Sequence, residues 1–176
     1  MSTVVETVAA LRAGELVILP TDTVYGLCGP ESEDAARRIA ELKGRPADQP
    51  IALLFADVAT ALERAPGLER AARLLPGPFT LIVGTLGIRV PELPPAAAEA
   101  VRAVGAVLAT SANLHGGPAP RRLEDVPYEI RAACAAEIDA GELPGVPSTV
   151  IDLGGPEPRI LREGAVPAAE TLRLLN

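Results

Sequence analysis

The stretch Leu16-Val17-Ile18-Leu19-Pro20-Thr21-Asp22-Thr23-Val24-Tyr25-Gly26-Leu27 (LVILPTDTVYGL) decides the fold class. Its first four residues are a short apolar run, which predicts a buried strand that ends at the proline. Polar residues follow at once, and ligands of α/β sheets usually bind at such strand-end loops. The stretch therefore predicts a strand that leads into one wall of a binding pocket.

The flanking segments alternate between helix and strand. Residues 4–13 have helical spacing before Gly14, and 32–42 form a second predicted helix with Ser32 as N-cap and an acidic first turn. Further helical segments are predicted within 57–75 and at 95–103 and 128–136, and strands at 51–55, 79–83, 88–90, 106–109, 149–153 and 159–161. Interleaved strands and helices indicate an α/β domain, and their irregular spacing after residue 79 favours a mixed sheet.

Length and composition indicate one soluble globular domain, residues 1–176, with an aliphatic core: 48% of the residues are hydrophobic and 2% aromatic. No apolar run approaches the roughly 18–20 residues that span a bilayer. The N-terminus lacks the basic region of a signal peptide. Cys28 and Cys134 are far apart and have no metal-ligand spacing, which favours thiols in a reducing compartment. We expect a cytoplasmic protein with no metal site of its own and no membrane contact.

The net charge of −7 argues against broad electrostatic binding to nucleic acid, so an anionic ligand must be met by a few well-placed cations. The segment ELKGRPADQP (41–50) holds Lys43, the only lysine, and Gln49, the only glutamine. Taken alone, this segment fits a charged helix end as well as an anion site.

Other scarce residue types gather near predicted strand ends. Asn113 is the only internal asparagine, His115 is the only histidine, and Ser111 and Ser148 are two of four serines. Each segment alone could be an ordinary turn, since Asn, Asp, Gly and Pro are turn formers. The Ser111/His115 pair lacks a G-x-S-x-G context, so a hydrolase triad is not indicated. Together the segments predict one polar pocket.

Seven motifs in this order resemble the YrdC-like family of threonylcarbamoyl-AMP synthases, in its short single-domain form. They run from about residue 16 to 165, and they are PTDTVYGL (20–27), KGRP (43–46), PGPFT (76–80), GIRVP (87–91), TSAN (110–113), STVID (148–152) and LREG (161–164). The resemblance implies a twisted open mixed sheet flanked by helices, with a concave ligand cavity.

The resemblance also implies a reaction. L-threonine, bicarbonate and ATP would give threonylcarbamoyl-AMP and pyrophosphate, which makes the enzyme a nucleotidyltransferase. Mg2+ would accompany the ATP phosphates. The product would feed the threonylcarbamoyladenosine modification of tRNA, through separate downstream proteins that transfer the group.

The resemblance assigns the site residues as follows. Lys43 and Arg45 would be the catalytic cations. The contacts to ATP would come from Lys43, Arg45, Gln49, Thr85, Asn113, Arg121 and Arg162. Threonine would be enclosed by Thr23, Tyr25, Arg89, Ser111 and Ser148, with Arg89 on its carboxylate. We also expect Lys43→Ala to abolish turnover without unfolding the protein, on the assumption that Lys43 is an exposed loop cation.

Two alternatives stay open from the sequence. One is an RNA-binding module of this fold without the activity, with weak RNA binding in the concave face. The other is a paralogue that uses another carbamoyl or acyl substrate, because fold does not fix function. The second rests on a short 81–88 segment and on Leu54, which stands where some relatives have a histidine.

Overall fold

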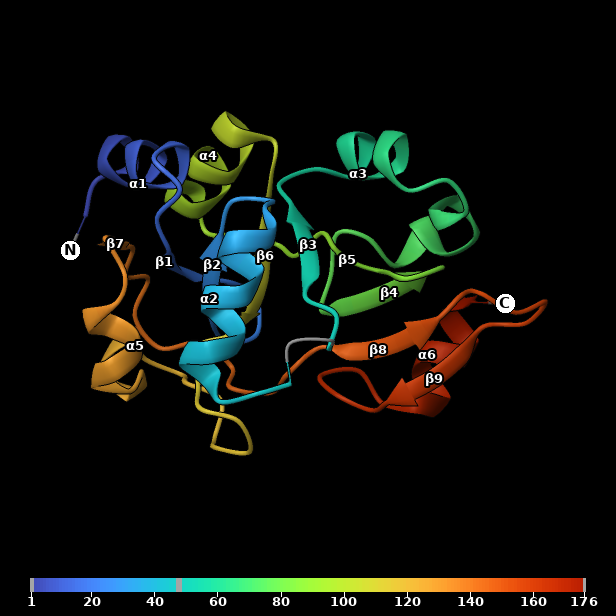
Figure 1. Ribbon diagram of the computed structural model, residues 1–176. Coiled ribbons are helices and arrows are strands. Elements are labelled where there is room, and N and C mark those ends of the chain that lie inside the picture. Colours follow the sequence, from blue (N-terminus) through green and yellow to red (C-terminus); the bar gives the residue numbers. More distant parts are fainter. Residues whose placement is uncertain (1, 47–48, 176) are drawn as a thin grey trace.

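The computed structural model describes residues 2–46 and 49–175 (Figure 1). Its helices are α1 (Val4–Arg12), α2 (Glu33–Lys43), α3 (Val58–Arg64), α4 (Pro95–Val104), α5 (Tyr128–Ala132) and α6 (Ala168–Leu175), with 3-10 helices η1 (Leu68–Leu74) and η2 (Leu123–Asp125). Its strands are β1 (Val17–Pro20), β2 (Tyr25–Gly29), β3 (Ala52–Phe55), β4 (Phe79–Val83), β5 (Leu86–Arg89), β6 (Ala106–Ser111), β7 (Ala136–Glu137), β8 (Thr149–Asp152) and β9 (Arg159–Arg162).

In the described part of the chain, nine strands form one open sheet in the order β7-β1-β2-β6-β3-β5-β4-β8-β9. The β1/β7, β3/β5 and β4/β8 pairs are parallel and the other neighbouring pairs are antiparallel. The predicted mixed α/β sheet is therefore confirmed. No helix among the described residues is long and apolar enough to cross a membrane.

Three elements differ from the sequence prediction. β2 begins inside the stretch that we interpreted as a polar loop and runs to Gly29; two glycines and a short length hide its strand pattern. The helix predicted for 128–136 ends at Ala132, since Ala136 and Glu137 pair with β1 as β7. Helix α6 was not predicted at all.

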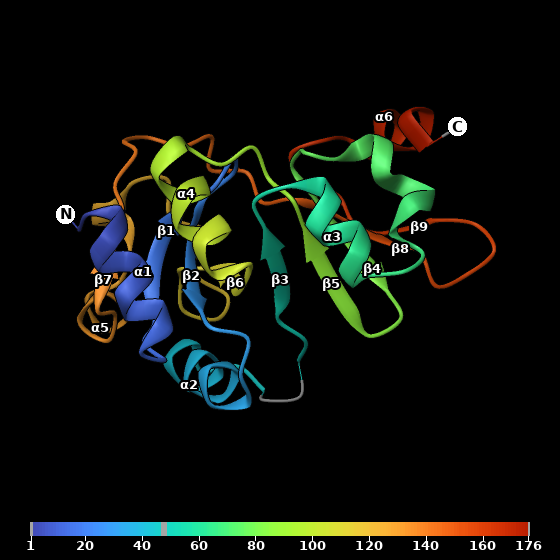
Figure 2. The ribbon, with the colours of Figure 1, turned by 90° about the horizontal axis from the view of Figure 1, so that it is seen from above.

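Alternate residues of the strands pack into two different cores. Ile18 of β1 and Leu53 and Phe55 of β3 belong to one cluster, which α2, α3 and η1 cover. Their strand neighbours Val17 and Leu54 belong to the other cluster, which α1 and α4 cover. Figures 1 and 2 show α2 and α4 on opposite faces of the β1–β2–β6 part of the sheet.

Helix α2 begins at its predicted N-cap and ends at Lys43, one residue beyond the predicted end. The Ser32 hydroxyl accepts the Ala35 N–H at 3.2 Å, as an N-cap does. Gly44 follows Lys43 with φ +62°, a left-handed conformation that favours glycine, and it ends the helix. This turn directs Lys43 and Arg45 into different surroundings.

Candidate functional site

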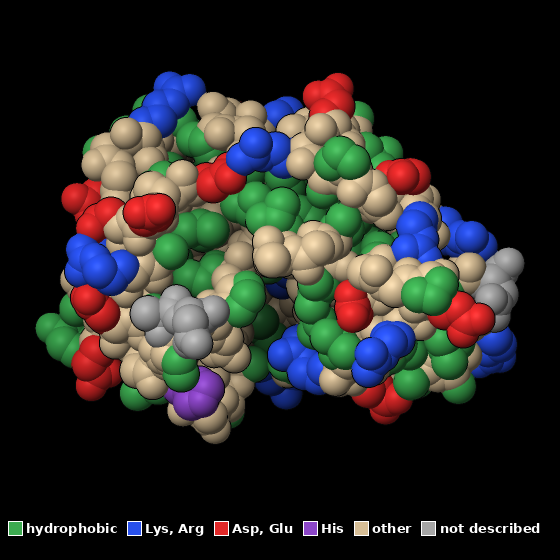
Figure 3. Space-filling model, turned by 45° about the vertical axis from the view of Figure 1, so that its right-hand side comes forward, with side chains coloured by type: hydrophobic (Ala, Val, Ile, Leu, Met, Phe, Trp, Pro, Cys, Tyr) green, Lys and Arg blue, Asp and Glu red, His purple; other side chains and the backbone are tan. Residues whose placement is uncertain are grey.

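A cavity of about 680 Å³ lies over the second half of the sheet. Strand residues that line it, Thr80 and Ile82 of β4, Arg89 of β5 and Val150 of β8, alternate with residues of the first core cluster. They therefore lie on the same face of the sheet as the second core cluster. Helices α1 and α4 cover that face over β1, β2 and β6, and the cavity lies over β4, β5 and β8. Figure 3 shows the molecule hollowed near its centre, with Lys or Arg side chains along the lower rim of the hollow. This volume is in the usual range for small-molecule sites.

The cavity is positively charged although the protein is acidic. Arg45, Arg89 and Arg162 line it from three different segments, and none of the described lining residues is Asp or Glu. The Nε atoms of Arg45 and Arg89 are buried and have no hydrogen-bond partner among the described residues. Buried donors without partners favour an incoming acceptor. The cavity is therefore suited to an anionic ligand.

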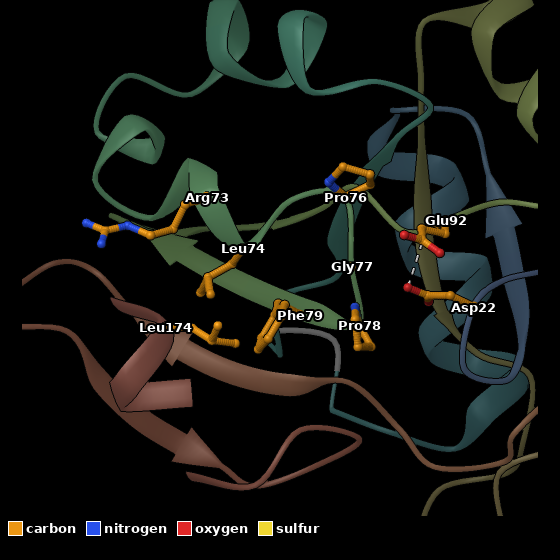
Figure 4. A pocket seen from close by; sticks show the side chains of 9 residues that line it. All are labelled: Asp22, Arg73, Leu74, Pro76, Gly77, Pro78, Phe79, Glu92 and Leu174. Atoms are coloured by element: carbon orange, nitrogen blue, oxygen red, sulfur yellow. Dashed lines mark hydrogen bonds between the residues drawn. The ribbon is translucent and has the colours of Figure 1, made fainter. Parts of the chain in front are cut away.

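Arg89 is held in place by a carboxylate behind the cavity wall. Its Nη2 donates to Asp22 Oδ1 at 3.0 Å and to Thr23 Oγ1 at 3.2 Å, and both charged side chains are 11% exposed. Asp22 does not line this cavity; it lines a smaller one of about 380 Å³ with Glu92, Pro78 and other residues (Figure 4). The ion pair thus forms part of the partition between the two cavities. Burial raises the pKa of Asp22, and Arg89 opposes that rise.

A pair of hydroxyls lies on the β4–β8 side. Thr80 Oγ1 and Ser148 Oγ are 2.8 Å apart, and Arg162 donates from Nη2 to the Ser148 carbonyl at 2.8 Å. Arg162 thereby connects β9 to the start of β8. The pair supplies neutral hydrogen-bonding groups beside the cationic ones.

Lys43 lies outside the cavity lining. Its side chain is buried, and its Nζ donates to the carbonyl oxygens of Ser111 and Asn113, each at 2.5 Å. Burial, with a smaller effect from Arg45, lowers the pKa of Lys43 to about 8. The expectation of an exposed loop cation was wrong, because Lys43 is the last residue of a packed helix.

Of the predicted site residues, nine line the cavity: Thr23, Arg45, Gln49, Thr85, Arg89, Ser111, Asn113, Ser148 and Arg162. Their contacts to substrates stay predictions. The Arg45 guanidinium also donates to the carbonyls of Gln49 and Pro50, which lie four and five residues further along the chain.

Besides Lys43, two predicted residues, Tyr25 and Arg121, do not line the cavity. Tyr25 is fully buried on the opposite face, where its hydroxyl lies 2.7 Å from Asp139 Oδ1 and accepts the Ala140 N–H at 3.0 Å. Burial and the Asp139 contact raise the pKa of Tyr25 to about 12. Arg121 pairs with Glu142 at 2.7 Å and does not line the cavity. Both side chains contact residues 139–143, and their contacts to substrates stay predictions.

Sequence reasoning missed Asp22 and Thr80 as individual site residues, although both lie in the quoted motifs. A signal existed for Thr80: it is a polar residue between apolar Phe79 and Leu81, which is the alternation of a strand with one polar face. Asp22 gave no such signal, because its partner Arg89 is 67 residues away.

The fold and the cavity together define an open-sheet α/β protein with a positively charged cavity. Residues 9–164 match the Sua5/YciO/YrdC family model, whose description is "Telomere recombination", and the chain belongs to this family. The chain is 34% identical to the threonylcarbamoyl-AMP synthase of Bacillus subtilis, covering 93% of this chain and 54% of that protein. It is 35% identical to the threonylcarbamoyl-AMP synthase of Halorhodospira halophila, and the match covers 89% of this chain and 87% of that protein.

Solved structures agree in fold. Pyrococcus abyssi Sua5 in complex with L-threonine has a TM-score of 0.87 and 32% identity, over 97% of this chain and 56% of that one. Escherichia coli YciO has a TM-score of 0.82 at 24% identity, over 96% of this chain and 91% of that one. This likeness supports the fold alone. The chain thus spans about half the length of the B. subtilis and P. abyssi relatives.

Proposed function

We propose that this protein is a threonylcarbamoyl-AMP synthase that makes threonylcarbamoyl-AMP and pyrophosphate from L-threonine, bicarbonate and ATP. The observation that carries the proposal is the cavity, in which three guanidiniums and several hydroxyls gather without a described carboxylate. The names of the B. subtilis and H. halophila relatives support it, as does the threonine bound to the P. abyssi protein.

The reaction requires positioning more than a nucleophilic side chain. The threonine amine combines with bicarbonate to give a carbamate and water, and a carbamate oxygen then attacks the α-phosphorus in line. The bond from that phosphorus to the bridging oxygen breaks, and pyrophosphate leaves. Such a transfer is accelerated by alignment and by neutralisation of phosphate charge. The class of reaction is therefore nucleotidyl transfer.

We assign Arg45 and Arg162 to the phosphates because both line the cavity and come from two separate segments, the loop after α2 and strand β9. Gln49, Thr85 and Asn113 would contact the rest of the nucleotide. Arg89 would take the threonine carboxylate, with Thr23, Ser111 and Ser148 around the amino acid. Mg2+ would enter with ATP, held by phosphates and water; the described residues contain no group of three His, Cys, Asp or Glu side chains suited to a metal.

The direct test supplies the purified protein with ATP, Mg2+ and bicarbonate and measures pyrophosphate for each amino acid in turn. We expect release with threonine. Release with a different amine or acyl acceptor would identify a paralogue with another substrate. Folded protein that releases none, but binds RNA in a salt-sensitive manner, would identify the RNA-binding alternative.

Removal of either phosphate-facing guanidinium should weaken ATP binding selectively. For Arg45→Ala and Arg162→Ala we expect the KM for ATP to rise about 10- to 100-fold, since a hydrogen bond to a charged group contributes roughly 1.5–3 kcal/mol. Arg121→Ala is the matched control, because Arg121 lies outside the cavity lining. Equal effects of all three substitutions would contradict the assignment. The measurement is steady-state pyrophosphate release at varied ATP.

A further inference from the structure

The chain's only lysine fastens helix α2 to the segment that follows β6. The Lys43 ammonium donates to the carbonyls of Ser111 and Asn113 at 2.5 Å each, and it lies 3.3 Å from Asn113 Oδ1. The backbone carbonyl of the same lysine accepts the His115 N–H at 2.8 Å. Both ends of one residue thus contact residues 111–115.

This contact continues into the cavity wall. The Ser111 hydroxyl donates to Asn113 Oδ1 at 2.5 Å, and Asn113 Nδ2 donates to the carbonyl of Gly117 at 2.7 Å. Ser111, Asn113 and Gly117 all line the cavity, whereas Lys43 does not. The lysine therefore lies behind the residues that would meet the substrates.

The chemistry of the contact suits an ammonium. Three N–H donors on a compact tetrahedral centre can meet the two carbonyls and the amide oxygen together, and a planar guanidinium has a different geometry. A buried charge is costly unless hydrogen bonds stabilise it, and only 5% of the residue surface is exposed. Turning Nζ towards a phosphate would break these contacts.

We propose that Lys43 is a positioning residue, whose ammonium holds the Ser111–Asn113 segment in the geometry that forms one wall of the substrate cavity. The assignment of the two substrates to that wall rests on the proposed function. We call the contacts of the Lys43 ammonium with Ser111 and Asn113 the clamp. Because Ser111 is assigned to threonine and Asn113 to ATP, loss of the clamp weakens the binding of both substrates. A direct phosphate ligand would affect ATP alone.

The kinetic test compares Lys43→Met, Lys43→Arg and Arg37→Met by pyrophosphate release at varied ATP and varied threonine. Arg37 is the control on the same helix, since it makes only surface contacts with Asp34 and Glu41. We expect Lys43→Met to raise both KM values about tenfold or more, without rescue by Lys43→Arg, and Arg37→Met to leave them unchanged. A rise confined to the KM for ATP, rescued by Lys43→Arg, would overturn the proposal.

A second measurement needs neither a variant nor activity. Protein labelled with 15N-lysine carries a single side-chain ammonium, because the chain has one lysine. We expect a slowly exchanging ammonium signal in the ligand-free protein that persists when Mg2+ and ATP are added. A signal that exchanges too fast to observe until ATP is added would refute the clamp. If the parent releases no pyrophosphate, the proposed function fails, while this signal still decides the role of Lys43.

Discussion

Arg89→Met is expected to lower the free energy of unfolding by about 3–5 kcal/mol, the range for removing one partner of a buried ion pair. Asp22, whose side chain is 11% exposed in the parent protein, would lose the cationic partner that lies 3.0 Å from its carboxylate. The same substitution removes the group assigned to the threonine carboxylate, so threonine-dependent pyrophosphate release should be lost. Urea unfolding followed by circular dichroism measures the stability change.

The pH dependence of this loss has a definite sign. Burial raises the pKa of Asp22, so the folded state holds its proton more tightly than the unfolded state does. Stability then falls as pH rises through the folded pKa. Removing Arg89 removes the interaction that opposes this rise, so the stability deficit of Arg89→Met should be largest near neutral pH and should shrink as pH falls towards about 3.9, the ordinary pKa of an aspartate.

Two controls separate the buried charge from other causes. The double variant Asp22→Asn/Arg89→Met leaves no unpaired buried charge at this position, so we expect it to regain most of the free energy of unfolding that Arg89→Met loses. Arg64→Met removes an exposed pair with Glu31 and should cost less than about 1 kcal/mol. A deficit of Arg89→Met that is the same at both pH values, and that the double variant retains, would show that Asp22 does not cause it.

Gly164→Ala should displace Ser148 from the cavity. A β-carbon on Gly164 would lie 2.3 Å from the Pro147 carbonyl oxygen and 2.5 Å from the Ser148 carbonyl group, which are backbone atoms that cannot rotate away. Hydrogen bonds hold the two segments together: the Gly164 N–H donates to Thr149 Oγ1 at 3.0 Å, and the Ala165 N–H donates to the Pro147 carbonyl at 2.8 Å. The clash must therefore move one segment.

We expect this variant to lose about 1–3 kcal/mol of stability, as overpacked sites do. Pyrophosphate release should fall more than tenfold, since displacements of about 1 Å at a positioned group can cost that much or more. Gly155→Ala is the control in the β8–β9 turn, where the new β-carbon would lie an ordinary 3.5 Å from the nearest backbone oxygen. If Gly164→Ala keeps full activity, the close approach does not position Ser148.

Much of the fold is encoded locally. The apolar run at residues 16–19 formed β1 as predicted, and Ser32 and Gly44 delimit α2, because burial of a short apolar run and helix capping depend on neighbouring residues. The sequence also predicted that several scarce residue types share one pocket, and Gln49, Ser111, Asn113 and Ser148 do line it, whereas Tyr25, Lys43 and His115 do not.

The tertiary structure decided which side chains face the pocket. Tyr25 follows Thr23 by two residues, yet the pairing of Gly26 with Ser111 places Tyr25 on the face opposite the cavity. Lys43 and Arg45 differ in the same way, because the left-handed turn at Gly44 separates a buried clamp from a cavity cation. The direction in which these side chains point depends on strand register and on partners many residues away in the sequence, as Arg89 is from Asp22. Neither can be predicted from neighbouring residues alone.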